Sequence, residues 1–161
     1  MMRRLVIPIL LLLVAVPSAF AAGPSRAQIR GFLLRSPGVA PGIKDTIREG
    51  RFSAGIDRIV RGDLTGDGQP EEVVTVFSGG TAGDIAFYVL SGEGSGMHAI
   101  KSSNREYKIG VQIVAGQLQV TRPLYAASDP NCCPEHLEIT TYRYDGRRLV
   151  SSARKRIKTP K

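Results

Sequence analysis

A short acidic loop and an adjacent pair of cysteines are the two places where residue types and spacing could do chemistry. Calcium-binding loops place oxygen ligands at positions 1, 3, 5, 7 and 9, with a glycine at position 6 for a sharp turn. When Asp63 is counted as position 1, Gly68 takes position 6. The oxygen-bearing positions are then Asp63, Thr65, Asp67, Gln69 and Glu71. A weak Ca²⁺ site, with Gln69 contributing its backbone carbonyl, is therefore one interpretation of this loop.

Two features separate this loop from an EF-hand. Position 12 is Val74, so the bidentate glutamate of an EF-hand is missing, and the following residues have the character of a strand. The alternative is a tight turn at Asp67 and Gly68, in which the carboxylates accept hydrogen bonds from backbone N–H groups. The sequence leaves both interpretations open.

Cys132 and Cys133 are the only cysteines of the chain. Adjacent Cα atoms lie about 3.8 Å apart across a trans peptide, below the roughly 4.4–6.8 Å of ordinary disulfides. A vicinal disulfide therefore needs a distorted backbone, although an oxidising compartment favours it. A buried reduced pair and an intermolecular bridge are the alternatives. A zinc site with His136 lacks the usual ligand spacing and a fourth ligand.

The start of the chain has the pattern of a secretory signal peptide. Arg3 and Arg4 precede an apolar run over 5–16, and Ala19-Phe20-Ala21 is a cleavage site of the A-x-A type. The apolar run is shorter than the roughly 20 residues that cross a bilayer, so we expect no membrane-spanning segment. The mature protein is therefore expected to be periplasmic or secreted.

The rest of the sequence predicts an α+β, β-dominated fold, an antiparallel meander with a short N-terminal helix on one face. Ser25 and Gln28 have the spacing of a capping box and begin a helix over about 26–35, and a weaker helical stretch covers about 43–49. No long helical crossover is present, as a parallel sheet would require. The expected strands, rich in β-branched and aromatic residues, are 56–60, 73–77, 85–90, 111–114, 117–120, 140–144 and 147–150, the last two joined by a two-residue turn at Asp145 and Gly146.

The chain divides into four expected segments: a signal peptide (1–21), a helical segment (22–55), a β domain (56–152) and a basic C-terminal tail (153–161). Much of the net charge of +8 lies towards the end of the chain. This end is either a solvated, partly frayed tail or a contact surface for an anionic envelope polymer or membrane surface. Nucleic acid is not an expected partner, because export removes the chain from the cytoplasm and no recognised motif accompanies the charge.

The acidic loop and the strands after it resemble one unit of the FG-GAP, integrin-type repeat. The resemblance rests on Asp63–Gly68, Val73–Val76, Gly79–Gly83 and Phe87–Gly92. It implies a strand-loop-strand unit that cradles Ca²⁺. Only one copy occurs here, so the chain cannot build a multi-bladed propeller from this unit.

A broader resemblance covers most of the mature region. The acidic loop, then Asp129–Pro134 with its Cys-Cys-Pro block, then Tyr142–Gly146, resemble in this order the LppP/LprE type of bacterial envelope proteins. This resemblance implies an envelope location and supplies no reaction. Most members are lipoproteins, whereas no cysteine for a lipid anchor follows the apolar run here.

Catalytic motifs are absent from the sequence: it has no G-x-S-x-G elbow, P-loop or H-E-x-x-H. Glu71 and Glu72 are adjacent in a predicted strand and are expected to point to opposite faces. Our first hypothesis is therefore a non-enzymatic envelope binding or structural module of unknown partner. The second is a periplasmic redox-active or hydrolytic protein that uses Cys132 and Cys133 as a redox pair.

Overall fold

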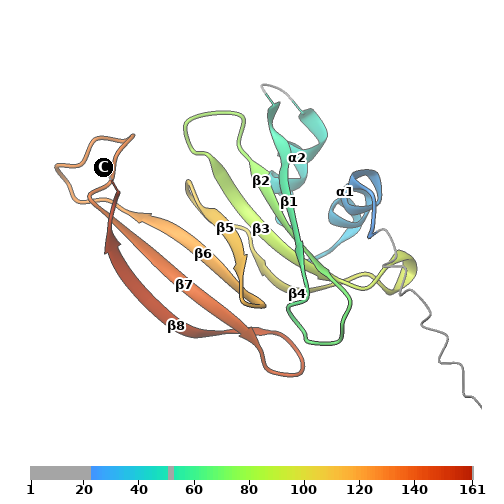
Figure 1. Ribbon diagram of the computed structural model, residues 1–161. Helices are drawn as coiled ribbons and strands as arrows, with labels where there is room; N and C mark the ends of the chain where they lie inside the picture. The colour runs from blue at the N-terminus through green and yellow to red at the C-terminus, as the bar shows by residue number, and fades with distance from the viewer. Residues whose placement is uncertain (1–22, 51–52, 161) are drawn as a thin grey trace, which may run out of the picture.

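The computed structural model describes residues 23–50 and 53–160, so the signal peptide expected at 1–21 lies outside the described residues. Two short helices precede eight strands in this part of the chain. The strands form two separate four-stranded antiparallel sheets, each a simple meander (Figure 1). The predicted β-dominated, antiparallel class is confirmed, but one sheet was expected and there are two.

The first sheet has the order β1-β2-β3-β4 and the second the order β5-β6-β7-β8. The strands are β1 (Gly55–Gly62), β2 (Glu71–Phe77), β3 (Asp84–Ser91), β4 (His98–Ser103), β5 (Gly110–Val114), β6 (Gln117–Leu124), β7 (His136–Tyr144) and β8 (Leu149–Lys158). A 3₁₀ turn, η2 (Gly94–Gly96), lies between β3 and β4.

Helices α1 (Arg26–Arg35) and α2 (Pro41–Glu49) have different end signals. The Ser25 hydroxyl accepts a hydrogen bond from the Gln28 N–H, and the Gln28 side chain accepts one from the Ser25 N–H, which completes a capping box. Helix α2 begins with Pro41, and it is followed by a C-cap, Gly50, whose φ of 59° is left-handed. No helix within residues 23–50 and 53–160 is long and apolar enough to cross a membrane.

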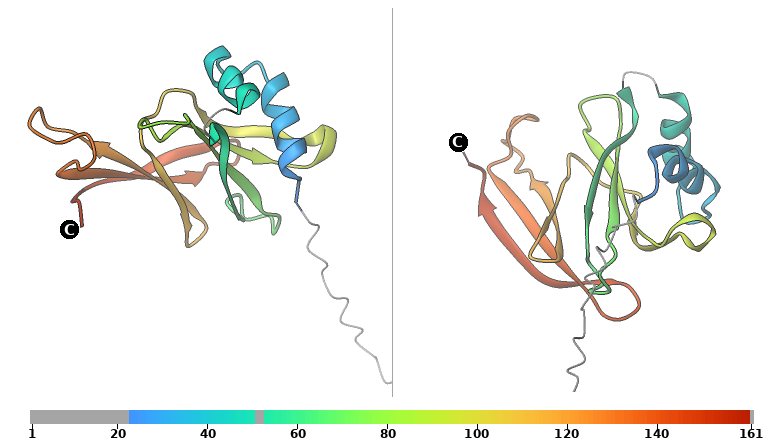
Figure 2. Two further views of the ribbon diagram at one scale, coloured as in Figure 1. Left: turned by 90° about the horizontal axis from the view of Figure 1, so that it is seen from above. Right: turned by 45° about the vertical axis from the view of Figure 1, so that its right-hand side comes forward.

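The molecule has three layers, with the first sheet between the helices and the second sheet (Figure 2). One face of the first sheet packs on the helices, in a core that includes Leu33 and Val74. The opposite face packs on the second sheet, in a core that includes Val73, Phe87 and Leu118. Strands β2 and β3 are therefore covered on both faces, which is why consecutive residues, 71–76 of β2 and 86–90 of β3, are buried without alternation.

The C-terminal part of the chain differs from the sequence prediction in two ways. Strand β7 ends at Tyr144, which pairs with Leu149, so the connection covers residues 145–148 and the predicted two-residue turn is wrong. The basic segment expected as a tail over 153–161 is strand through Lys158, paired along β7. The local sequence did not reveal this strand, because β8 has no apolar alternation. The strand forms because its backbone pairs with β7, which a local pattern does not show.

Candidate functional site

The acidic loop connects β1 to β2, and its aspartates accept hydrogen bonds from the loop's own backbone. The two carboxylate oxygens of Asp63 accept from the N–H groups of Gly66, at 2.6 Å, and Gly68, at 2.9 Å. Asp67 accepts from the Gln69 N–H at 2.8 Å. These bonds hold the loop in the turn that was the alternative to a calcium site.

Glu71 stabilises the same loop from inside the protein. Its side chain is 1% exposed, and one oxygen accepts from the N–H groups of Leu64, at 2.7 Å, and Thr65, at 3.1 Å. The other oxygen accepts from the hydroxyls of Thr65, at 3.3 Å, and Ser91, at 3.1 Å. Four hydrogen bonds therefore compensate the burial of this carboxylate.

The structure brings Thr65 and Glu71 together but does not gather the three carboxylates around one point. Across the part of the chain that the structure describes, no three histidine, cysteine, aspartate or glutamate residues are grouped closely enough to hold a metal ion. Ca²⁺ binding by Asp63, Thr65, Asp67, Gln69 and Glu71 stays a prediction.

Glu72, the neighbour of Glu71, interacts with a different group. It is also 1% exposed, and its carboxylate accepts a hydrogen bond from Nε of Arg61 at 3.4 Å. Burial raises the pKa of Glu72, and Arg61 only partly opposes this change. The sequence did not predict that both adjacent carboxylates are buried, because the groups that pair with them, Ser91 for Glu71 and Arg61 for Glu72, lie on other strands.

The cysteine loop joins β6 to β7. The sulfur atoms of Cys132 and Cys133 are bonded in the structure, with the two Cα atoms 3.8 Å apart and a trans peptide between them. Asp129 fixes the ends of the loop, because its carboxylate accepts from the N–H groups of Ala126, at 2.9 Å, and Glu135, at 3.1 Å. These two hydrogen bonds lower the pKa of Asp129.

A lysine from the connection between the two sheets holds the same loop. Nζ of Lys108 donates to both the backbone carbonyl and the side-chain oxygen of Asn131, next to the cysteines. It also lies 5.1 Å from the ring centre of Tyr107 and 5.7 Å from that of Tyr125, within the range of cation–π attraction. The cysteine loop is therefore anchored to the body of the protein.

The second sheet presents a basic face along β8. Arg154, Arg156 and Lys158 pair across the ladder with Thr140, Glu138 and His136, respectively. Directly paired residues of an antiparallel sheet project to the same face, and alternate residues of one strand share a face. The three cations therefore form a row on the face that carries the buried Thr140.

Carboxylates neutralise this row only in part. Arg154 lies 3.8 Å from Glu138 and Lys158 lies 3.9 Å from Glu135, both distances between nitrogen and carboxylate oxygen. Among the described residues, no carboxylate lies within 4.0 Å of Arg156. The sequence prediction placed this charge in a tail and missed the ordered row, because Arg154, Lys155 and Arg156 are consecutive cations and show no strand alternation.

The fold and these surfaces define a small module of two antiparallel sheets with a basic edge strand. Comparison with known proteins finds similarity to a lipoprotein, CseA, of Streptomyces avermitilis, which is 31% identical over 93 residues. The aligned region is 58% of this chain and 42% of the relative, so the chain spans less than half the length of that protein. The match is consistent with an exported, envelope-associated protein. No protein-family model matches the chain, and no solved structure does.

Proposed function

We propose that this protein is an exported, non-enzymatic module that binds an anionic polymer of the cell envelope along the second sheet. The observation that carries the proposal is the row of Arg154, Arg156 and Lys158 on one face of β8. Alternate residues of an antiparallel strand lie about 6.8 Å apart on the same face. An extended polyanion with repeated charged groups can contact several members of such a row at once.

The charge of this region is one-sided. Residues 145–158 contain a single acidic residue, Asp145, and a much larger set of cations: Arg147, Arg148, Arg154, Lys155, Arg156 and Lys158. This concentration of like charge attracts polyanions at moderate salt. The similarity to a lipoprotein supports an envelope setting, in which such polymers are accessible.

A simpler explanation is that charged side chains on β8 protect an exposed sheet edge from pairing with another chain. The two explanations predict different binding. Edge protection needs charge but no ligand, whereas polymer binding requires affinity that depends on the face carrying Arg154 and Arg156.

The test is binding of the purified full chain to immobilised polyphosphate and poly-glutamate at about 0.15 M salt, where screening leaves close contacts intact. We expect Arg154→Gln/Arg156→Gln to lose about tenfold in affinity for the preferred polymer. The matched control is Arg48→Gln/Arg58→Gln, which removes the same charge from α2 and β1. Equal loss in both variants, or no binding by wild type, contradicts the proposal.

Weak Ca²⁺ binding by the acidic loop is a second proposal, supported by the spacing of its oxygen-bearing residues. It requires Asp63 to exchange the N–H groups of Gly66 and Gly68 for a cation. With no bidentate ligand at position 12, the expected dissociation constant is on the order of 10⁻⁴–10⁻³ M.

A further inference from the structure

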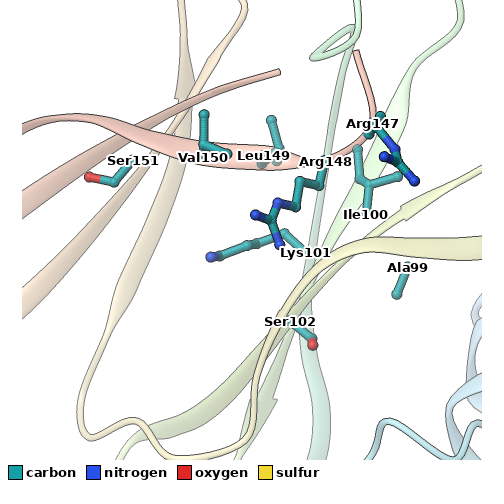
Figure 3. Close-up of a pocket in the computed structure, with 9 residues that line it drawn as sticks. All are labelled: Ala99, Ile100, Lys101, Ser102, Arg147, Arg148, Leu149, Val150 and Ser151. Atoms are coloured by element: carbon teal, nitrogen blue, oxygen red, sulfur yellow. The ribbon is translucent and has the colours of Figure 1, made fainter. Parts of the chain in front are cut away.

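A pocket of about 580 Å³ lies between the two sheets at their outer strands (Figure 3). One wall is residues 99–102 of β4 and the other is residues 147–151, from the turn before β8 and the start of that strand. Three of the lining side chains are cationic, Lys101, Arg147 and Arg148. In Figure 3 the side chains of Lys101 and Arg148 project into the space between the two strands.

A β-bulge directs Lys101 towards the second sheet. Lys101 pairs with Val89, whereas Ala99 pairs with Leu90, so Ile100 is an extra residue in β4. Val89 is buried between the two sheets, and a directly paired residue projects to the same face. Lys101 therefore faces the second sheet, where its Nζ lies 4.8 Å from the ring centre of Tyr142. Bulges commonly re-aim a side chain in this way.

The turn before β8 fixes the other two cations. The Asp145 carboxylate accepts from the N–H groups of Arg147 and Arg148, both at 2.9 Å. These bonds lower the pKa of Asp145, and the Arg148 charge adds to the effect. Leu149, which follows, is 1% exposed and packs in the core between the sheets. The backbone that carries the arginines is therefore held at both ends.

The cations of the pocket are not paired with acids. Within residues 23–50 and 53–160, no carboxylate oxygen lies within 4.0 Å of a side-chain nitrogen of Lys101, Arg147 or Arg148. Like charges that share a site repel one another, and a bound anion removes that repulsion. The hydroxyl of Ser151, which also lines the pocket, is a further donor, because Ser151 pairs with Tyr142 of the core between the sheets.

We propose that this pocket binds a phosphate group, and that it holds one phosphate of a polymer that also contacts the row of cations on β8. The inference rests on the proposed function and narrows the ligand from any polyanion to one that carries phosphate. The guanidinium group presents its donors as a planar fork that matches phosphate oxygens, and lysine adds a point charge. A carboxylate has fewer acceptor oxygens for three cations and a hydroxyl.

The test is an NMR titration of the isotope-labelled full chain with tripolyphosphate and, separately, with citrate at matched ionic strength. We expect saturable shifts confined to the amides of residues 99–102 and 147–151, with tripolyphosphate at least about tenfold tighter than citrate. Lys101→Gln and Arg148→Gln should each weaken binding about tenfold, and Lys101→Arg should retain it. The absence of a saturable shift, or equal affinity for citrate, would overturn the assignment.

A second variant separates this inference from the proposed function. Arg154→Gln/Arg156→Gln leaves the pocket intact and should keep the tripolyphosphate shifts. If wild type binds polymers through β8 but shows no tripolyphosphate site, the pocket assignment is wrong and the proposed function is not contradicted. If the tripolyphosphate site is present but no polymer binds, the proposed function fails. Binding to phosphatidylglycerol vesicles that depends on Lys101, without binding of tripolyphosphate, would also overturn the assignment, because a membrane surface would then be required.

Discussion

Arg122 of β6 and Glu106, in the connection between the two sheets, form a salt bridge with two hydrogen bonds. Nε of Arg122 donates to one carboxylate oxygen at 2.8 Å, and Nη2 donates to the other at 2.7 Å. The Glu106 N–H donates in turn to the carbonyl of Ile85 in β3, at 2.9 Å. The pair therefore joins a strand of the second sheet to a strand of the first. The hydrogen bonds to Glu106 raise the pKa of Arg122 above its ordinary value.

Replacing Glu106 by glutamine should destabilise the protein strongly. The side chains of Glu106 and Arg122 are only 7% and 23% exposed, so the variant leaves a largely buried guanidinium without its counter-charge. We expect the free energy of unfolding to fall by roughly 3 kcal/mol, measured by urea denaturation. The double variant Glu106→Leu/Arg122→Met removes both charges and should recover much of this loss. A single variant as stable as wild type would show that the pair does not hold the sheets together.

Glu72→Gln should change how stability depends on pH. Burial raises the pKa of Glu72 from its ordinary 4.5, so the folded state binds this proton more tightly than the unfolded state. Its contribution to stability is therefore complete below pH 4.5 and is lost as pH rises through the raised pKa. Chemical denaturation between pH 4 and 8 should show a flatter profile for the variant than for wild type.

Asp145→Asn is a control whose effect on stability should have the opposite dependence on pH. Backbone hydrogen bonds from Arg148 and Arg147 lower the pKa of Asp145 from 3.8, so its contribution is present above 3.8 and is lost as pH falls through the lowered value. The difference between this variant and wild type should therefore grow as pH rises from about 2 to 5. Identical profiles for Glu72→Gln and wild type would contradict the assignment of Glu72.

Asp63→Ala tests the acidic loop without requiring a metal. The N–H groups of Gly66 and Gly68 would lose their acceptor, so we expect a loss of about 1 kcal/mol in EDTA, with water replacing part of the interaction. The calcium proposal predicts in addition that millimolar Ca²⁺ stabilises wild type by about 1 kcal/mol and leaves Asp67→Ala unchanged. Thermal unfolding measures both effects. If Ca²⁺ does not change the thermal stability of wild type, the calcium proposal is wrong and the loop is only a turn.

A disulfide between Cys132 and Cys133 should be visible in the mass of the protein. Non-reducing mass spectrometry of native exported protein should show loss of two hydrogens within the monomer, as a Cys132–Cys133 disulfide requires. Cys132→Ser/Cys133→Ser should cost little stability, because the bridge closes almost no chain and Asp129 and Lys108 also hold the loop. Two thiols that alkylate freely in the native protein would exclude the disulfide. Ready reduction by a mild dithiol would favour the redox hypothesis.

Some elements could be predicted from local sequence because local interactions determine them. The β-branched residues of Val73–Phe77 and the apolar run of Ile85–Leu90 indicated strands, and these lie in β2 and β3. Strand β4 could not be predicted in the same way. Its sequence, His-Ala-Ile-Lys-Ser-Ser, has no apolar alternation, because a bulge at Ile100 interrupts it and the strand lies at the edge of the sheet.

The sequence by itself determined which segments have the residue types of strands, where the acidic loop lies and that the two cysteines are adjacent. Each of these depends on residues close together in the chain. Only the tertiary structure decided that the meander breaks into two sheets and that the basic end is a strand. It also decided that Lys101 and Arg148 line one pocket. The physical reason is that Ile100 and Leu149 are buried in the same core between the sheets, and the removal of this apolar surface from water holds their cationic neighbours near one another.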